Sequence, residues 1–372
     1  MIITAHVRLL HGFKYLMYAA TALLTACGTT LPSAPPPDPD AAPVWPAGAA
    51  SVVAPPAAPL SSRALASAAQ IAALQAIAEQ QNRLNVLAAP ILLGNVALCK
   101  RNARNVSGFV AKTQYAYASE LAGAARTALG LDERLRVMTV LPGSAAVQSG
   151  LLTGDVVLAV GDSKIAPGPN AERDAAKLIE TAGRGHAAIN LTILRGNTAL
   201  TLNLALSRAC ALDIELGNSD NVNSYTDGRR VMITRGMLNA TRSDEELAFV
   251  LAKEIAQGVL TTAARPGMRA MIERLLQNQP VPPATVRAPV LQPYVPVSDA
   301  TADKLALYML ARAGGNIEGA LSFWQNLAAK YPASLANSFT ALHPATPYRL
   351  SVIKAVTASI KLKQLNQLPL IP

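Results

Sequence analysis

Histidine and cysteine, the residues that most often build catalytic and metal sites, are scarce in this sequence. Among 372 residues there are four histidines and three cysteines. His6 and His11 lie close to the N-terminus, in a leader-like segment, so only His186 and His343 remain for a folded body. A catalytic zinc usually has three well-placed protein ligands, with nitrogen or sulfur among them. The composition therefore argues against a histidine-rich metal site.

Signatures of phosphate and nucleic-acid binding are also missing. The chain has no G-x-x-x-x-G-K-[ST] loop and no dinucleotide fingerprint between a strand and a helix. The net charge is +10, yet the basic residues are spread along the chain and are not interleaved with aromatic ones. We therefore expect a solvated basic surface and no nucleic-acid partner. An attraction to anionic membrane headgroups remains open.

Residues 1–26 are typical of an export signal. Arg8 and Lys14 supply positive charge, and the apolar run that ends at Cys27 is too short to span a bilayer. The ending "LTAC" resembles the lipobox of bacterial lipoproteins, although an ordinary signal peptide with a chance cysteine is the alternative. The resemblance implies cleavage before Cys27, a diacylglycerol on its thiol and membrane attachment through that lipid. Because Gly28 follows, and not aspartate, it also implies the periplasmic face of the bacterial outer membrane.

Residues 27–60 form a second segment, which is dense in proline and alanine. Such a composition cannot pack a core and favours extended polyproline II, so we predict a semi-stiff tether. From Ser61 to about Lys100, apolar residues recur at three- and four-residue steps, with no proline before Pro90. This spacing predicts helix, and we assign residues 61–125 to the first, helical part of a folded domain.

Cys99 and Cys210 flank a middle segment of short β-branched runs divided by Gly and Pro. In an oxidising periplasm these two cysteines are expected to pair, although two buried free thiols are the alternative. A disulfide that closes a loop of about a hundred residues would stabilise the fold by roughly 4 kcal/mol in the chain-entropy model. The pair would then join the two ends of an inserted domain.

The inserted segment resembles a PDZ domain of the bacterial, protease-associated type. The resemblance is carried by "VLPGSAAVQSGLLTGDVVLAV", and we place the domain at residues 126–208. It implies a β-sandwich or barrel that binds polypeptides or their C-termini, with Leu129, Gly130 and Leu131 offering backbone amides to a terminal carboxylate. A helix expected at residues 171–182 would form the other wall of the groove. An occluded groove that serves only for packing is the alternative.

Four sequence blocks in the C-terminal half resemble the gluzincin metallopeptidases of the CAAX prenyl protease and HtpX type, in the soluble branch that carries a PDZ insertion. In chain order they are "VNSYTDGRRVMITRGML", "RSDEELAFVLAKEIAQ", "SDATADKLALYMLARAGG" and "ALHPATPYRLSVIKA". The resemblance implies an α+β fold, in which a mainly helical zincin-like peptidase domain with a small edge sheet comprises residues 61–125 and 209–372. It also places Asn223, in the first block, at the peptide-binding edge of the cleft.

The zinc motif of that family is degenerate in this chain. Histidines at positions i and i+4 of a helix grip one zinc ion from the same face. Those positions hold Lys253 and Gln257, and the third ligand, a glutamate in the family, corresponds to Asp299. Glu254, at the position of the general base, is kept. We therefore expect no bound zinc and no other cofactor.

Two further residues match the family around this site. Asp303 corresponds to the aspartate that supports the metal ligands, and His343, in the tail motif, lies near the cleft in the family. The ammonium of Lys253 is expected either to fill the place of the metal, paired with Asp299 and Glu254, or to turn to solvent.

The sequence thus favours a catalytically inactive pseudo-peptidase, a periplasmic lipoprotein that binds polypeptide in envelope protein quality control. The alternative is an active metalloendopeptidase with an unorthodox metal site built from Glu254, Asp299, His343 and Gln257. A structural lipoprotein that uses neither groove is a third hypothesis. The sequence does not decide whether the protein is an enzyme, and it gives no oligomeric state.

Overall fold

The computed structural model describes residues 67–261, 266–276, 296–331 and 346–372. All of them belong to one compact unit, Ser62–Pro372. The expected signal peptide, the tether with Cys27, and His343 lie outside the described residues. Within the described ranges, no helix is long and apolar enough to cross a membrane.

The first helix, α1, runs from Ala68 to Gly94. Ser67 caps it, because its hydroxyl accepts the Gln70 amide while the Gln70 side chain accepts the Ser67 amide at 2.9 Å. Leu84 and Ile91, on the buried side of α1, join the main core. The helix that the residue spacing predicts is therefore present.

A six-stranded sheet forms the middle of the chain, with the strand order β2-β3-β4-β6-β7 and with β5 paired to β4. Its strands are β2 (Phe109–Lys112), β3 (Leu135–Val140), β4 (Val156–Val160), β5 (Ser163–Lys164), β6 (Ala188–Arg195) and β7 (Thr198–Ala205). All of these pairings are antiparallel. Because β2 pairs only with β3 among the described strands, it is an edge strand.

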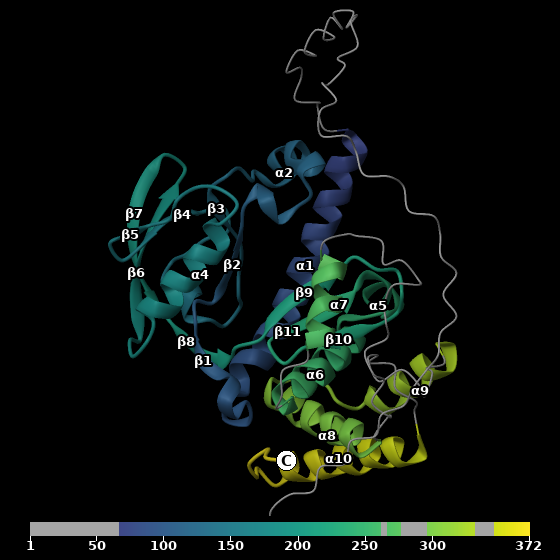
Figure 1. The fold of residues 1–372 in the computed structure, drawn as a ribbon. Helices are drawn as coiled ribbons and strands as arrows, with labels where there is room; N and C mark the ends of the chain where they lie inside the picture. Colours follow the sequence, from purple (N-terminus) through teal and green to yellow (C-terminus); the bar gives the residue numbers. More distant parts are fainter. Residues whose placement is uncertain (1–66, 262–265, 277–295, 332–345) are drawn as a thin grey trace, which may run out of the picture. The chain divides into compact units, whose positions relative to one another are not determined.

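Three helices accompany this sheet: α2 (Ala122–Leu129), α3 (Ala145–Gln148) and α4 (Ala171–Ala182). α4 lies across one face of the sheet (Figure 1) and packs Ala171 and Ala175 into its core. Glu172 and Asp174 are in the first turn of α4, where the helix dipole favours negative charge. The bounds of α4 agree with the helix predicted at residues 171–182.

A two-stranded ribbon closes the base of the middle segment. β1 (Ala103–Val106) pairs antiparallel with β8 (Ser207–Cys210), so that Ala103 lies opposite Cys210. Beside the ribbon, Cys99 and Cys210 form a disulfide, with their Cα atoms 5.5 Å apart. The predicted pairing is confirmed, and it holds the two ends of the middle segment together.

The rest of the described chain is a mainly helical body with a small sheet. The sheet has the order β10-β11-β9 and consists of β9 (Asp213–Gly217), β10 (Ser224–Thr226) and β11 (Arg230–Thr234). β10 and β11 form an antiparallel hairpin, whose turn uses Gly228 at a φ of +89°. β9 pairs with β11 in parallel.

The helices of this body are α5 (Arg235–Ala240), α6 (Asp244–Leu260), α7 (Pro266–Leu276), α8 (Pro296–Arg312), α9 (Ala320–Lys330) and α10 (Pro347–Leu365). α6 packs against α8, and α8 packs against α10 (Figure 1). Most of α6 is buried, and its apolar residues share one core with Phe323, Trp324 and Ile353 of α9 and α10. The fold is thus mixed helix and sheet, as the sequence indicates.

Candidate functional site

The central helix of the helical body, α6, begins with a strong N-terminal cap. The Ser243 hydroxyl accepts the amide of Glu246 at 3.2 Å, and three acidic residues lie in the first turn. The reciprocal half of a capping box is not formed, because the Glu246 carboxylate accepts the amide and the guanidinium of Arg242 instead. The cap fixes where α6 starts and so which of its residues face α8.

Lys253 and Glu254 lie in the buried middle of α6. Their exposed fractions are 2% and 4%. The Lys253 side chain reaches α8, where its ammonium donates a hydrogen bond to Asp299 Oδ1 at 2.9 Å. Asp299 is 3% exposed, so this ion pair is shielded from water. Of the two placements expected for Lys253, the structure has the buried one.

A second buried ion pair lies beside the first. Arg349, at the start of α10, donates from Nη2 to Asp303 Oδ1 at 2.9 Å and from Nε to the other oxygen of Asp303. Its Nε is also 3.9 Å from Asp299 Oδ2, which joins the two pairs. The Trp324 ring faces both cations, with Lys253 Nζ 5.4 Å and Arg349 Cζ 4.9 Å from its centroid. We call these five residues the ion cluster.

The hairpin strand β10 approaches the same part of α6. Tyr225, on β10, is buried, and burial raises its pKa to about 12. A hydrogen bond with the Asn223 side chain opposes this rise in pKa, whereas the charge of Glu254 adds to it. Asn223 and Glu254 therefore both lie close to Tyr225. The family resemblance places these two residues at one cleft.

The ion cluster does not have the donor set of a zinc site. Two of its members are cations, and the Lys253 ammonium is bonded to Asp299, the carboxylate expected at the third ligand position. Gln257, one turn after Lys253, is half-buried. Within the described ranges, no three His, Cys, Asp or Glu side chains are grouped as a metal site requires. His186 is exposed in the middle domain.

Arg349 and Trp324 belong to the ion cluster, although sequence reasoning did not single them out. Arg349 is 1% exposed and Trp324 is 5% exposed. A sequence clue to Arg349 is present in "HPATPYRL", where the arginine falls in the first turn of a helix that begins at Pro347. No comparable signal marks Trp324 as a partner of two cations.

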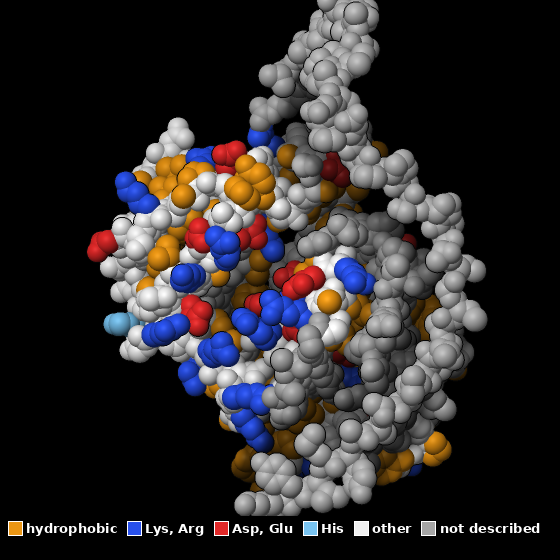
Figure 2. Space-filling view, in the orientation of Figure 1, with side chains coloured by type: hydrophobic (Ala, Val, Ile, Leu, Met, Phe, Trp, Pro, Cys, Tyr) orange, Lys and Arg blue, Asp and Glu red, His pale blue; other side chains and the backbone are white. Residues whose placement is uncertain are grey.

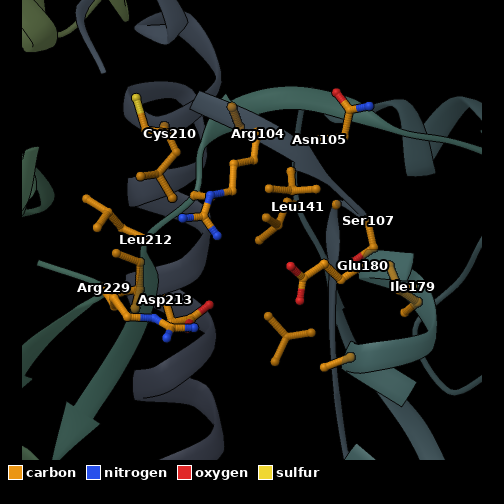
Figure 3. Close-up of a pocket in the computed structure, with 18 of the residues that line it drawn as sticks. Arg104, Asn105, Ser107, Leu141, Ile179, Glu180, Cys210, Leu212, Asp213 and Arg229 are labelled. Carbon is orange, nitrogen blue, oxygen red and sulfur yellow. The ribbon is translucent and has the colours of Figure 1, made fainter. Parts of the chain in front are cut away.

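A second candidate site lies at the free edge of β2. A cavity of about 1290 Å³ is bounded by β2 and α4 on one wall and by α1, β9 and the β10–β11 turn on another. Figure 3 shows Ile179 and Glu180 of α4 on one side and Leu212, Asp213 and Arg229 on the other. Because β2 is an edge strand, a bound peptide can add to it as a further strand beside α4.

Charges of both signs surround the end of β2 near the start of α4. Glu172 accepts the amide of Thr113 at 2.8 Å and lies 3.6 Å from Lys112 Nζ. Burial alone would lower the pKa of Lys112, but the charges of Glu215 and Glu172 outweigh burial and raise that pKa. Burial raises the pKa of Glu215, on the opposite wall. On the face drawn in Figure 2, basic and acidic side chains are likewise interspersed.

The other end of β2 is basic. Arg101, Arg104 and Arg208 line the cavity where β1 and β8 reach it. Figure 3 shows the Arg104 side chain pointing into the cavity. In the part of the chain that the structure describes, the Arg104 guanidinium makes no hydrogen bond or ion pair. Its charge is therefore available to an anionic group of a ligand.

The loop expected to receive a carboxylate lies elsewhere. Leu129 ends α2, and Gly130 terminates the helix at a φ of +65°. The amides of Gly130 and Leu131 donate to the carbonyls of Arg126 and Ala125, and Leu131 is fully buried. None of the three expected residues lines the cavity. In this structure the glycine closes a helix and its amide is already bonded, so the role expected for this loop stays a prediction.

Comparison with known families identifies the middle domain. Residues 114–206 match the family described as PDZ domain. A PDZ domain therefore occupies this part of the chain, which confirms the resemblance seen in the sequence. The match begins at residue 114, whereas residue 126 was expected, and β2 precedes it. PDZ domains typically bind peptide ligands, and this is the class of module that the sheet and α4 define. No curated protein matches the chain.

Proposed function

We propose that this protein is a lipid-anchored periplasmic protein that binds polypeptide and does not cut it. The observation that carries the proposal is the ion cluster, which places paired charges next to Glu254 at the centre of the helical body. The PDZ domain is the peptide-binding part. The expectation of a peptidase frame rests on the four sequence blocks that resemble gluzincin peptidases.

A peptidase frame without its metal would account for the ion cluster. Asp299 and Asp303 are both on α8 and both buried, and carboxylates in such a place need a positive partner. In a zinc site the metal would supply that charge. In this chain Lys253 neutralises Asp299, and Arg349 neutralises Asp303. We infer that the lysine replaces the charge of the metal and that no zinc binds.

The cavity beside β2 supports the proposal that a C-terminal peptide binds there. A ligand strand that runs antiparallel to β2 would have its last residue near the first residues of β2. Its carboxylate would then meet the basic end of the cavity, where Arg104 points inward. Leu141 and Ile179 offer apolar surface to its last side chain. We therefore infer a ligand with a free C-terminus and an apolar last residue.

Attachment through Cys27 completes the proposal. A lipid on this cysteine would anchor the chain, and residues 27–60 would hold the folded unit away from the bilayer, at the periplasmic face of the outer membrane. Both segments lie outside the described residues, so this part rests on the sequence alone. Envelope protein quality control is the process that a tethered peptide-binding protein would serve.

The alternative function, an active metalloendopeptidase, needs Glu254, Asp299, Gln257 and His343 to hold a metal ion. The geometry disfavours it, since Asp299 is bonded to an ammonium and Gln257 offers only a neutral oxygen. His343 lies outside the described residues. Chelator-sensitive cleavage of casein by the pure full chain would favour this alternative.

Fluorescence anisotropy with the full chain tests peptide binding. The probes are labelled peptides that end in valine or leucine, each made with a free carboxylate and with an amide. We expect binding of the free carboxylates only. Arg104→Gln should weaken binding about tenfold, because a hydrogen bond between charged groups is lost.

A matched pair of variants locates the groove. Ala176 and Lys177 are neighbours on α4 and both are exposed, but only the first of them lines the cavity. Ala176→Trp should block peptide binding, whereas Lys177→Trp should leave it unchanged. Equal binding by wild type and Ala176→Trp, or equal binding of amidated peptides, would contradict the assigned groove.

A further inference from the structure

The C-terminal end of the chain carries a concentration of exposed apolar residues. Among the described residues, the four most exposed large apolar side chains are Leu362, Leu365, Leu368 and Ile371, with exposed fractions from 54% to 82%. They recur at every third position. Single exposed apolar side chains are normal on a protein surface, but a cluster of them marks a contact site. We call these four residues the apolar tip.

The exposure of the apolar tip is built into the fold and does not come from a frayed end. After α10 the chain turns back, and the Leu368 amide donates to the Lys363 carbonyl at 2.8 Å. The Lys363 ammonium donates to the Ile371 carbonyl at 2.6 Å, and Arg312 donates to the Leu370 carbonyl at 3.4 Å. Leu370 packs against the main core. These contacts fix a tail in which Leu370 faces inward while Leu368 and Ile371 face outward.

The surroundings of the apolar tip are basic. Residues 347–372 include no acidic residue and four basic ones, of which Arg349 is buried and Lys354, Lys361 and Lys363 are exposed or partly exposed. Lys354 and Lys361 are seven residues apart on α10, so they share the helix face that leads to Leu365. Lys361 pairs with Glu318 at the surface, whereas Lys354 has no ion-pair partner among the described residues.

Leucines exposed beside lysines fit the surface of an anionic bilayer. Apolar side chains can enter the boundary between headgroups and acyl chains while neighbouring lysines remain at the level of the headgroups. Glu318 neutralises only Lys361, so Lys354 and Lys363 leave this surface with a net positive charge, which suits anionic headgroups. We propose that the apolar tip inserts into the surface of a membrane that contains anionic lipid. This contact is separate from the ion cluster, the PDZ groove and the proposed lipid at Cys27.

A fluorophore in the apolar tip tests the proposal on the full chain. Leu365→Cys is labelled with nitrobenzoxadiazole, and Lys177→Cys, at an exposed position of α4, is the control site. Both chains also carry Cys27→Ser, so that only the introduced thiol reacts, since Cys99 and Cys210 are paired. The probes are vesicles of phosphatidylglycerol and phosphatidylethanolamine with brominated acyl chains. We expect bromolipid quenching at residue 365 and none at residue 177.

Two sets of variants distinguish the contribution of charge to membrane binding from that of apolar insertion. Lys354→Glu with Lys361→Glu, and Leu362→Asn with Leu368→Asn, should each lower the quenching at residue 365 severalfold. All four side chains are exposed, so the variants should fold, which circular dichroism checks. Equal quenching at residues 365 and 177, or full quenching in neutral phosphatidylcholine vesicles, overturns the proposal. A spectral shift that grows with protein concentration without vesicles would show a second copy as the partner and would also overturn it.

Discussion

At the scale of single residues, the account depends most on Lys253. A lysine in an apolar interior is costly unless its charge is paired. The ammonium of Lys253 is bonded to Asp299 at 2.9 Å, and both side chains are buried. Removing one member of such a pair leaves the other charge alone, whereas replacing both with apolar residues is much less harmful. The two residues should therefore behave as a unit.

Lys253→Ala should lower the free energy of unfolding by about 3–5 kcal/mol, because buried Asp299 loses the ammonium that is hydrogen-bonded to it. Lys253→Met combined with Asp299→Leu should recover most of this loss. Urea denaturation followed by circular dichroism measures both. Lys304→Ala, at an exposed position of α8, is the control and should change stability by less than about 0.5 kcal/mol. Unchanged stability of Lys253→Ala would exclude a buried ion pair.

Asp155 is expected to make the stability of the PDZ domain depend on pH. Burial alone would raise the pKa of Asp155, but the Arg195 guanidinium and the Leu152 amide donate hydrogen bonds to its carboxylate and hold the pKa below its ordinary value. A carboxyl group with a lowered folded pKa stabilises the fold above its unfolded pKa of about 3.9. That stabilisation is lost as the pH falls through the folded pKa.

Asp155→Asn should therefore destabilise the protein by about 2 kcal/mol at neutral pH, where the charged hydrogen bonds are present in wild type. The difference in unfolding free energy between wild type and variant should shrink as the pH falls from about 5 to about 2. Urea denaturation over that range measures the difference. A difference that stays constant with pH would mean that the Asp155 charge does not contribute.

Three members of the ion cluster were singled out in the sequence: Lys253, Asp299 and Asp303. They were found through the resemblance to the peptidase family, and the pairing of Lys253 with Asp299 was one of two alternatives. Arg349 was not found, since it is 46 residues from Asp303 and meets it only through the packing of α10 on α8. Gly130 shows the same limit, because a left-handed glycine suits a carboxylate loop and a helix end equally well.

At the scale of elements, α4 could be predicted and β2 could not. α4 is a continuous helical pattern between Asn170 and Gly183, and its position beside the groove agrees with the expectation. β2 has only four residues, which are all half-buried, so it lacks the alternation that marks a strand. The helix beside the cavity could therefore be expected from the sequence, whereas the edge strand could not. "SGFVAK", which contains β2, is the stretch that would have located it.

The disulfide that joins the two ends of the middle segment offers a test at this scale. The disulfide between Cys99 and Cys210 closes a loop with a sequence separation of 111 residues, which corresponds to about 4–5 kcal/mol in the chain-entropy model. Cys99→Ala with Cys210→Ala should therefore lower the urea midpoint of unfolding. Dithiothreitol should lower the midpoint of wild type and leave that of the double variant unchanged. Equal midpoints for wild type and variant, with or without reductant, would contradict a stabilising disulfide.

For the whole molecule, the sequence predicted a mixed fold with a PDZ domain in the middle, because the PDZ pattern is local and the helical spacing is regular. The cavity beside β2 could not be predicted from the sequence, because its walls come from distant parts of the chain. Gln81 of α1 illustrates this, because its side chain bonds the Ile214 carbonyl at 2.9 Å and the Leu216 amide at 2.7 Å on β9. Such contacts depend on the packing of complete elements.

The proposed lipid anchor predicts where the whole molecule is found in the cell. The full chain should incorporate radiolabelled palmitate and sediment with outer membranes, because acyl chains on Cys27 hold it there. Cys27→Ser should abolish the label, whereas Cys210→Ala should keep it. Label retained by Cys27→Ser would contradict lipidation at this cysteine.

The central claim is our proposal that the buried pair of Lys253 and Asp299 takes the place of a metal ion, so that no zinc binds. The most direct measurement is the zinc content of the purified full chain, by inductively coupled plasma mass spectrometry after dialysis against dilute zinc. We predict that wild type retains no zinc and that Lys253→His, Gln257→His and Asp299→Glu together restore binding. One tightly held zinc ion per wild-type chain would contradict the account.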